Sequence, residues 1–139
     1  MNIDFERIEH IKNLIRRRDE LSAEIGALCS PRLTDTSLMP AIYSALVEIT
    51  HLTGRRMTDT VMLRYKFLFI VLYLYSPYTL AGGRIPTGLR SEIGRVLGLR
   101  SDSVISDNCR NIVFMYRTYE SFRRDIGYLY REIIARLDL

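Results

Sequence analysis

Arginine is the residue type in this sequence that is best suited to hold a charged partner. The 139 residues include 18 arginines but only two lysines, Lys12 and Lys66, against 16 acidic residues, so the formal net charge is +4. The planar guanidinium group donates paired hydrogen bonds to phosphate, carboxylate and guanine edges. The composition therefore permits a nucleic-acid partner, and a solvated helical surface on which arginines pair with acids is the alternative.

Residue types that carry out catalysis occur without the spacing that catalysis needs. His10 and His51 have no paired acid or nucleophile nearby, which leaves hydrolase chemistry without a base. Cys29 and Cys109 have neither CxxC spacing nor a histidine pair, so the sequence predicts no zinc site and no disulfide framework.

One further enzymatic possibility is the cleavage of a DNA strand by a tyrosine recombinase. It would use arginines and tyrosines in the second half of the chain: Arg84, Arg110, Arg117, Tyr116 and Tyr119. The chain is short for such an enzyme, and this region lacks a histidine. We therefore expect no enzymatic activity, no cofactor, no metal ion and no small-molecule ligand.

The stretch GLRSEIGRVLGLRSDSVISDNCRNI, residues 88–112, has the spacing of two short helices that cross at a tight turn. Its first half supplies small residues for a close crossing and apolar residues to clamp it: Ile93, Gly94, Leu97, Gly98 and Leu99. Ser101 or Asp102 can cap the second helix. The apolar spacing then turns Ile105, Cys109 and Ile112 inward at positions i, i+4 and i+7.

The segment EIGRVLGLRSDSVISDNCRNI resembles the helix-turn-helix of LuxR-type response regulators and of the fourth region of sigma factors. Six residues match the pattern of those families, with glycine for alanine at one of them: Glu92, Ile93, Gly94, Leu97, Gly98 and Leu99. Either Ile105 replaces the buried valine of these families, which makes the turn one residue longer, or Val104 replaces it and the downstream apolar spacing shifts by one. The resemblance covers about a sixth of the chain.

The resemblance implies a helix-turn-helix at residues 88–113 whose second helix enters the major groove of double-stranded DNA. The implied contacts are Arg84, Arg90, Arg100, Ser101, Ser103, Ser106, Asp107, Asn108 and Arg110. Arg90 and Arg100 would lie near phosphates, and Asn108 would read adenine if it faces outward. Further arginines cluster at residues 16–18, 55–56 and 123–124. Asp102 and Asp107 oppose phosphate, so a corner between core helices without DNA contact is the alternative.

The first 30 residues predict a helical arm. Apolar residues occupy alternating heptad a and d positions, with Arg18 at one a position: Ile11, Leu14, Leu21, Ile25 and Leu28. This pattern indicates a coiled coil that makes the protein a homo-oligomer. Ile8 and Ile15 widen the stripe, so docking of the helix onto a protein body is the alternative. The N-terminus lacks the features of a signal peptide, and a reducing, cytoplasmic location is expected.

After the linker CSPRLTDTSLMP, residues 36–139 predict an all-α helical bundle. A helix at 38–52 would stop at Gly54. Thr58 or Asp59 would cap a central helix, apolar on nearly all sides, that breaks at Ser76-Pro77. Its apolar run, residues 67–75, is about half of the ~20 residues that cross a membrane, so no membrane partner is expected.

The remaining segments predict a turn and further helices. Gly82-Gly83 marks the turn, although a phosphate-cradling loop without the P-loop pattern is an alternative, and Thr87 would cap the next helix. The final segment would form one long helix or two helices joined near Thr118. Its aromatic side chains would belong to the core or a protein interface, or alternatively stack on bases: Phe114, Tyr116, Tyr119, Phe122, Tyr128 and Tyr130.

Taken together, these patterns predict a non-enzymatic DNA-binding protein, such as a transcriptional regulator or an accessory factor of a phage or mobile element. Association through the N-terminal arm would place two reading helices on half-sites about one DNA turn apart. The alternative is a helical oligomeric adaptor or scaffold, for example a phage structural or DNA-packaging component, in which the same corner serves folding alone.

Overall fold

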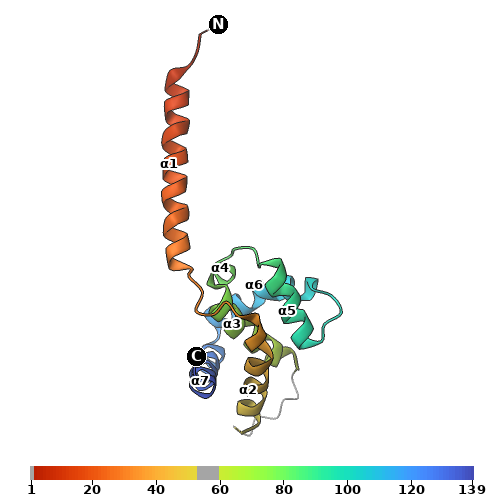
Figure 1. Ribbon diagram of the computed structural model, residues 1–139. Coiled ribbons are helices and arrows are strands. Elements are labelled where there is room, and N and C mark those ends of the chain that lie inside the picture. Colours follow the sequence, from red (N-terminus) through yellow and green to blue (C-terminus); the bar gives the residue numbers. More distant parts are fainter. Residues whose placement is uncertain (1, 53–59) are drawn as a thin grey trace. The chain divides into compact units, whose positions relative to one another are not determined.

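The computed structural model of the chain describes residues 2–52 and 60–139, and within them it contains helices and no strand (Figure 1). The predicted all-α class is confirmed. The chain divides into two compact units, residues 1–30 and 31–139. The first contains α1 (Phe5–Leu28), and the second contains η1 (Thr36–Leu38), α2 (Met39–Leu52), α3 (Thr60–Tyr75), α4 (Pro77–Leu80), α5 (Thr87–Leu97), α6 (Ser103–Thr118) and α7 (Glu120–Leu137). Predicted features at Gly54, Thr58, Asp59 and residues 55–56 lie outside the described residues.

The first unit is a single helix without a buried residue. Asp4 caps α1, because its carboxylate accepts a hydrogen bond from the backbone N–H of Arg7 at 3.0 Å. Ion pairs on its surface join Arg16 to Glu20 and Arg18 to Asp19. The apolar side chains of its predicted a and d positions are 45% to 79% exposed, so the stripe on α1 is uncovered.

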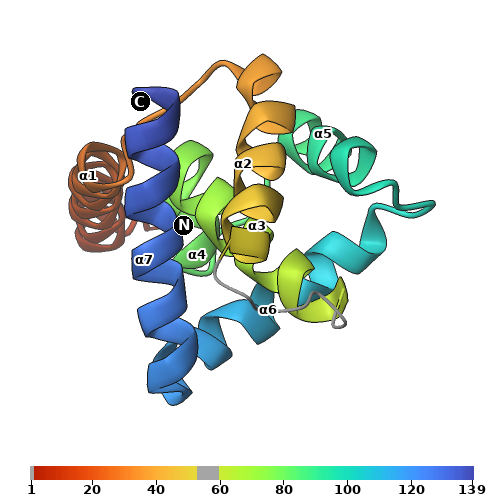
Figure 2. The ribbon, with the colours of Figure 1, turned by 90° about the horizontal axis from the view of Figure 1, so that it is seen from below.

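The second unit is built around α3, which packs against α2, α4, α5, α6 and α7 (Figure 2). All side chains from Phe67 to Leu72 are buried, which explains why this helix is apolar on nearly all sides. The prediction of a central helix is confirmed. Among the described residues, no helix combines the length and the apolar character that crossing a membrane requires.

The chain turns sharply after α3. Pro77 ends the helix and starts α4, a short helix that the sequence pattern did not predict. The hydroxyls of Ser76 and Thr79, both buried, lie 2.8 Å apart and satisfy each other inside this turn. Gly82 has a φ of 102°, a conformation that glycine adopts without strain. The turn delivers residues 81–86 to the side of α6.

The C-terminal segment forms two helices rather than one. Tyr119 is in an extended conformation between α6 and α7. The Arg123 guanidinium donates hydrogen bonds to the carbonyls of Tyr116 and Arg117, at 2.9 and 3.2 Å, and thereby caps the end of α6. The apolar face of α7 is buried against α2, α3 and α6.

Three hydrogen bonds attach residues 32–35 to the rest of the second unit. Arg32 donates to the carbonyl of Leu139 at 2.8 Å, and the N–H of Leu33 donates to the carbonyl of Leu74 at 3.0 Å. The hydroxyl of Tyr75 donates to the carbonyl of Asp35 at 2.6 Å. Burial, together with the nearby charge of Asp35, raises the pKa of Tyr75 to about 12.

Candidate functional site

The corner between α5 and α6 is formed by glycine at two positions. Gly98 ends α5 with a φ of 68°, and the N–H of Leu99 donates to the carbonyl of Gly94 at 2.9 Å. A Cβ atom at Gly94 would lie 2.8 Å from Oδ1 of Asp102, so glycine allows the start of α6 to lie against α5. The expected cap at Thr87 is wrong, because α5 begins directly after Pro86 and has no side-chain cap.

The start of α6 resolves which residue faces the core. Ile105 is fully buried whereas Val104 is partly exposed, so Ile105 occupies the inward position and the longer turn applies. The N–H of Ser103 donates to the Ser101 hydroxyl at 3.3 Å. The Asp102 carboxylate instead accepts a hydrogen bond from the Ser91 hydroxyl of α5, also at 3.3 Å. The Asp102 side chain therefore joins the two helices.

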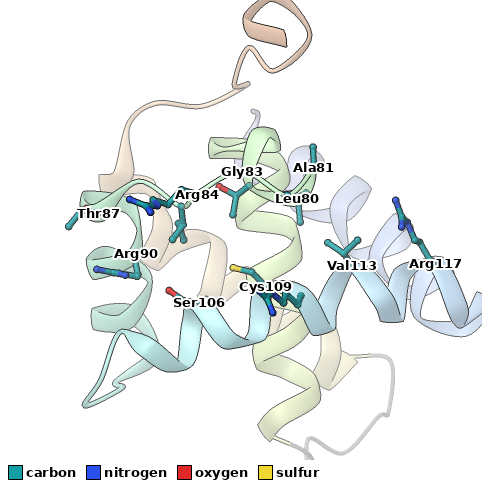
Figure 3. Close-up of a pocket in the computed structure, with 14 residues that line it drawn as sticks. Leu80, Ala81, Gly83, Arg84, Thr87, Arg90, Ser106, Cys109, Val113 and Arg117 are labelled. Carbon is teal, nitrogen blue, oxygen red and sulfur yellow. The ribbon is translucent and has the colours of Figure 1, made fainter. Parts of the chain in front are cut away.

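A groove of about 860 Å³ lies between α5, α6 and the turn that follows α4 (Figure 3). Four arginines line it: Arg84 from the turn, Arg90 from α5, and Arg110 and Arg117 from α6. The hydroxyls of Thr87 and Ser106 add neutral hydrogen-bond donors. No aspartate or glutamate is among the lining residues, and none of the four arginines forms an ion pair with a described residue.

Arg90 is the least solvated of these arginines. Its Nε atom is buried and has no hydrogen-bond partner among the described residues. A buried donor without an acceptor costs roughly 1–3 kcal/mol, and more when the group is charged. Arg95, on the same helix, differs because it is paired with Glu92, and the hydrogen bond from Arg95 lowers the pKa of the Glu92 carboxyl. The four groove arginines therefore differ from Arg95 in having no anionic partner among the described residues.

The predicted DNA-contact residues divide into three groups. Arg84, Arg90, Ser106 and Arg110 line the groove. Arg100, Ser101, Ser103 and Asp107 are exposed but lie outside its lining. Asn108 does not face outward as reading adenine would require: it is 8% exposed, because it shares the inward face of α6 with Ile105 and Ile112.

The sequence patterns did not indicate that Arg117 lines this groove. They suggested this arginine only for the recombinase site, which was set aside. The signal was present in the spacing of Ser106, Arg110, Val113 and Arg117, which repeats every three or four residues and therefore follows one face of a helix. Extending the stripe beyond Arg110 required knowing that α6 continues to Thr118.

Three of the six aromatic side chains considered for base stacking pack inside the protein. Tyr116 stacks on Phe69 with ring centroids 4.6 Å apart, and Phe122 meets the same ring edge-on at 6.4 Å. Tyr130 packs against Tyr73. The core interpretation is confirmed for these three residues from the final segment. Phe114 and Tyr119 are 59% and 50% exposed, and Tyr128 is also exposed.

The groove contains four cationic side chains and one cysteine. Cys109 lines it, but burial raises the pKa of this thiol and no described histidine lies among the lining residues. In the described part of the chain, no group of three or more potential metal ligands occurs. Comparison with known protein families, with curated proteins and with solved structures finds no match for this chain.

Proposed function

We propose that this chain is a non-enzymatic DNA-binding protein in which α5 and α6 act as a helix-turn-helix and α6 enters the major groove. The observation that carries the proposal is the set of four arginines, free of ion pairs with described residues, that line the groove between α5, α6 and the turn after α4. The glycine corner supports it as well. Close crossing at Gly94 and the left-handed turn at Gly98 are what a helix-turn-helix requires.

In this proposal the side chains on and just before α6 contact different parts of the DNA. Ser103, Ser106 and Asp107, near its start, face base edges, where serine is permissive and a carboxylate accepts a hydrogen bond from cytosine. Arg110 can donate two hydrogen bonds to guanine. Arg100, in the turn before α6, contacts phosphate, and the bond from Ser91 draws the Asp102 carboxylate toward α5.

The test is duplex binding as a function of salt concentration. For wild type, fluorescence anisotropy with a labelled random duplex at about 50 mM salt is expected to show binding, and log affinity should fall with log salt at a slope of about −0.9 per phosphate contacted. Arg90→Ala with Arg100→Ala should weaken it. Arg124→Ala with Arg131→Ala, which removes the same charge from exposed positions on α7, is the matched control. Absence of duplex binding by the wild type at low salt would contradict the proposal.

We further propose that α1 forms a parallel coiled coil with α1 of a second copy. Most helical stability in proteins comes from packing of an apolar face, and this helix of 24 residues leaves its apolar a and d positions exposed. A second copy presents the same heptads, which cover that stripe. Two helix-turn-helix units in one particle would then address half-sites one DNA turn apart.

Sedimentation equilibrium tests the coiled coil. Leu14→Asp with Leu21→Asp places charges at two d positions and should reduce the particle mass to that of one chain. Asn13→Asp with Ala23→Asp adds the same charges on the opposite face of α1 and should leave the dimer intact. Equal particle masses for both double variants would contradict a coiled coil through the a and d positions of α1.

The second candidate function is a helical oligomeric adaptor, and the uncovered stripe on α1 is the observation that favours it. In that case the chain would associate through α1 without binding duplex. The two measurements above separate the candidates, because an adaptor forms oligomers yet shows no salt-dependent duplex affinity.

A further inference from the structure

We propose that the arginine-lined groove binds the sugar–phosphate backbone of one DNA strand along α6. This inference rests on the proposed function and assigns to the groove a contact that does not depend on base sequence. The chemistry is that of a row of guanidinium groups facing a row of phosphodiesters. It adds Arg117, which is absent from the DNA contacts predicted for the helix-turn-helix, to the groups that contact the strand.

The groove residues are spread over a length that suits an extended polyanion. At a rise of 1.5 Å per residue, Arg110 lies about 6 Å along α6 from Ser106, and Arg117 lies about 16 Å along α6 from Ser106. Figure 3 shows Arg84 and Arg90 near the α5 end of the groove, with Arg117 at the opposite end. Cations spread over such a length cannot all contact one phosphate group.

One strand of duplex DNA carries a phosphate every 3.4 Å along the helix axis, so a groove about 16 Å long faces roughly four or five of them. Arg110 and Arg117 lie along that length, and Arg84 and Arg90 line the groove at its α5 end. This extent favours a strand over a phosphate monoester, for which the cations would be gathered at one point.

Arg90 supplies the second, independent observation. Its buried Nε has no acceptor among the described residues, and the hydroxyls of Thr87 and Ser106 line the same groove. A phosphodiester in the groove would pair with this guanidinium, which has no ion pair with a described residue. Because no carboxylate lines the groove, an incoming phosphate meets no like charge there.

The experiment compares salt slopes in two double variants of the full chain. Arg84→Gln with Arg117→Gln removes two groove cations, and Arg124→Gln with Arg131→Gln removes two exposed cations from α7. On a random duplex the groove variant should lower the magnitude of the log–log slope by about 1.8, or 0.9 per phosphate contact, while the control keeps the wild-type slope. The loss should be equal on two duplexes of unrelated sequence.

A second pair, Arg84→Gln with Arg90→Gln, should give the same reduction, and both pairs leave in place Arg110, the residue proposed to read guanine. Unchanged thermal unfolding of each variant, followed by circular dichroism, shows that the fold is retained. A wild-type slope in both groove variants would overturn the groove assignment while leaving duplex binding intact. Absence of duplex binding by the wild type would overturn both proposals.

Calorimetry with inorganic pyrophosphate separates a strand from a free phosphate ligand. The wild type should bind pyrophosphate no more tightly than the millimolar range, because a small anion reaches too few of the spread arginines at once. Micromolar pyrophosphate binding that Arg110→Gln with Arg117→Gln abolishes would overturn the backbone assignment in favour of a free phosphate compound.

Discussion

Two helices of this chain, α1 and α7, both carry apolar residues at helical spacing, but only α7 buries them. α7 spans 18 residues and buries Phe122, Ile126, Leu129 and Ile133. α1 spans 24 residues and buries none. Periodicity therefore establishes that a helix has a face to cover, but not what covers it. For α7 the cover is α2, α3 and α6 of the same unit, and for α1 we propose a second copy of the chain.

The largest expected effect is in α7. Ile133 is fully buried, and Ile133→Ala should lower the free energy of unfolding by about 2–5 kcal/mol through lost transfer energy and a residual cavity. Urea unfolding followed by circular dichroism measures this. A loss below about 1 kcal/mol would show that the face of α7 contributes no more than an exposed face does.

The corner between α5 and α6 should show an intermediate effect. Gly98→Ala places a side chain at a φ of 68° and should cost about 1–2 kcal/mol of unfolding free energy, because the left-handed region is disfavoured for residues with a Cβ. Gly26→Ala in α1, where nothing lies near the added Cβ, is the matched control and should not destabilise the protein. Equal responses at both glycines would mean that the turn does not depend on Gly98.

Tyr75→Phe tests the hydrogen bond that attaches residues 32–35 to the helical bundle. Loss of its hydrogen bond to Asp35 should cost about 0.5–1.5 kcal/mol at neutral pH. Since the folded-state pKa of Tyr75 is raised to about 12, above its ordinary value near 10, wild type should lose stability as pH rises from about 10 to 12. Unfolding curves at several pH values should show a smaller loss in the variant. An equal loss of stability between pH 10 and 12 in wild type and variant would show that the Tyr75 hydroxyl does not cause it.

The smallest effect is expected at Leu14→Ala in α1. This side chain is exposed, so in dilute protein, where the dimer has dissociated, the free energy of unfolding should change by no more than about 0.5 kcal/mol. Chemical unfolding at low protein concentration checks this against Ile133→Ala. A cost comparable with that in α7 would mean that α1 has a cover within its own chain.

The fold was largely predictable because its strongest signals are local. The run from Phe67 to Leu72 marked α3 as central, and the Ser76-Pro77 break marked its end. The groove was not predictable in the same way. Arg84, Arg90 and Arg117 are separated in sequence and come together only when the turn after α4 packs beside α6. Asn108 shows the same limit, because its burial depends on which face of α6 meets α3.

The choice of arginine throughout the groove also bears on regulation. Acetylation removes the charge of lysine, but it does not act on a guanidinium group, and methylation of arginine keeps the charge while it blocks paired hydrogen bonds. A surface with four arginines and no lysine along its wall therefore keeps its attraction for anions in a cell that acetylates basic proteins.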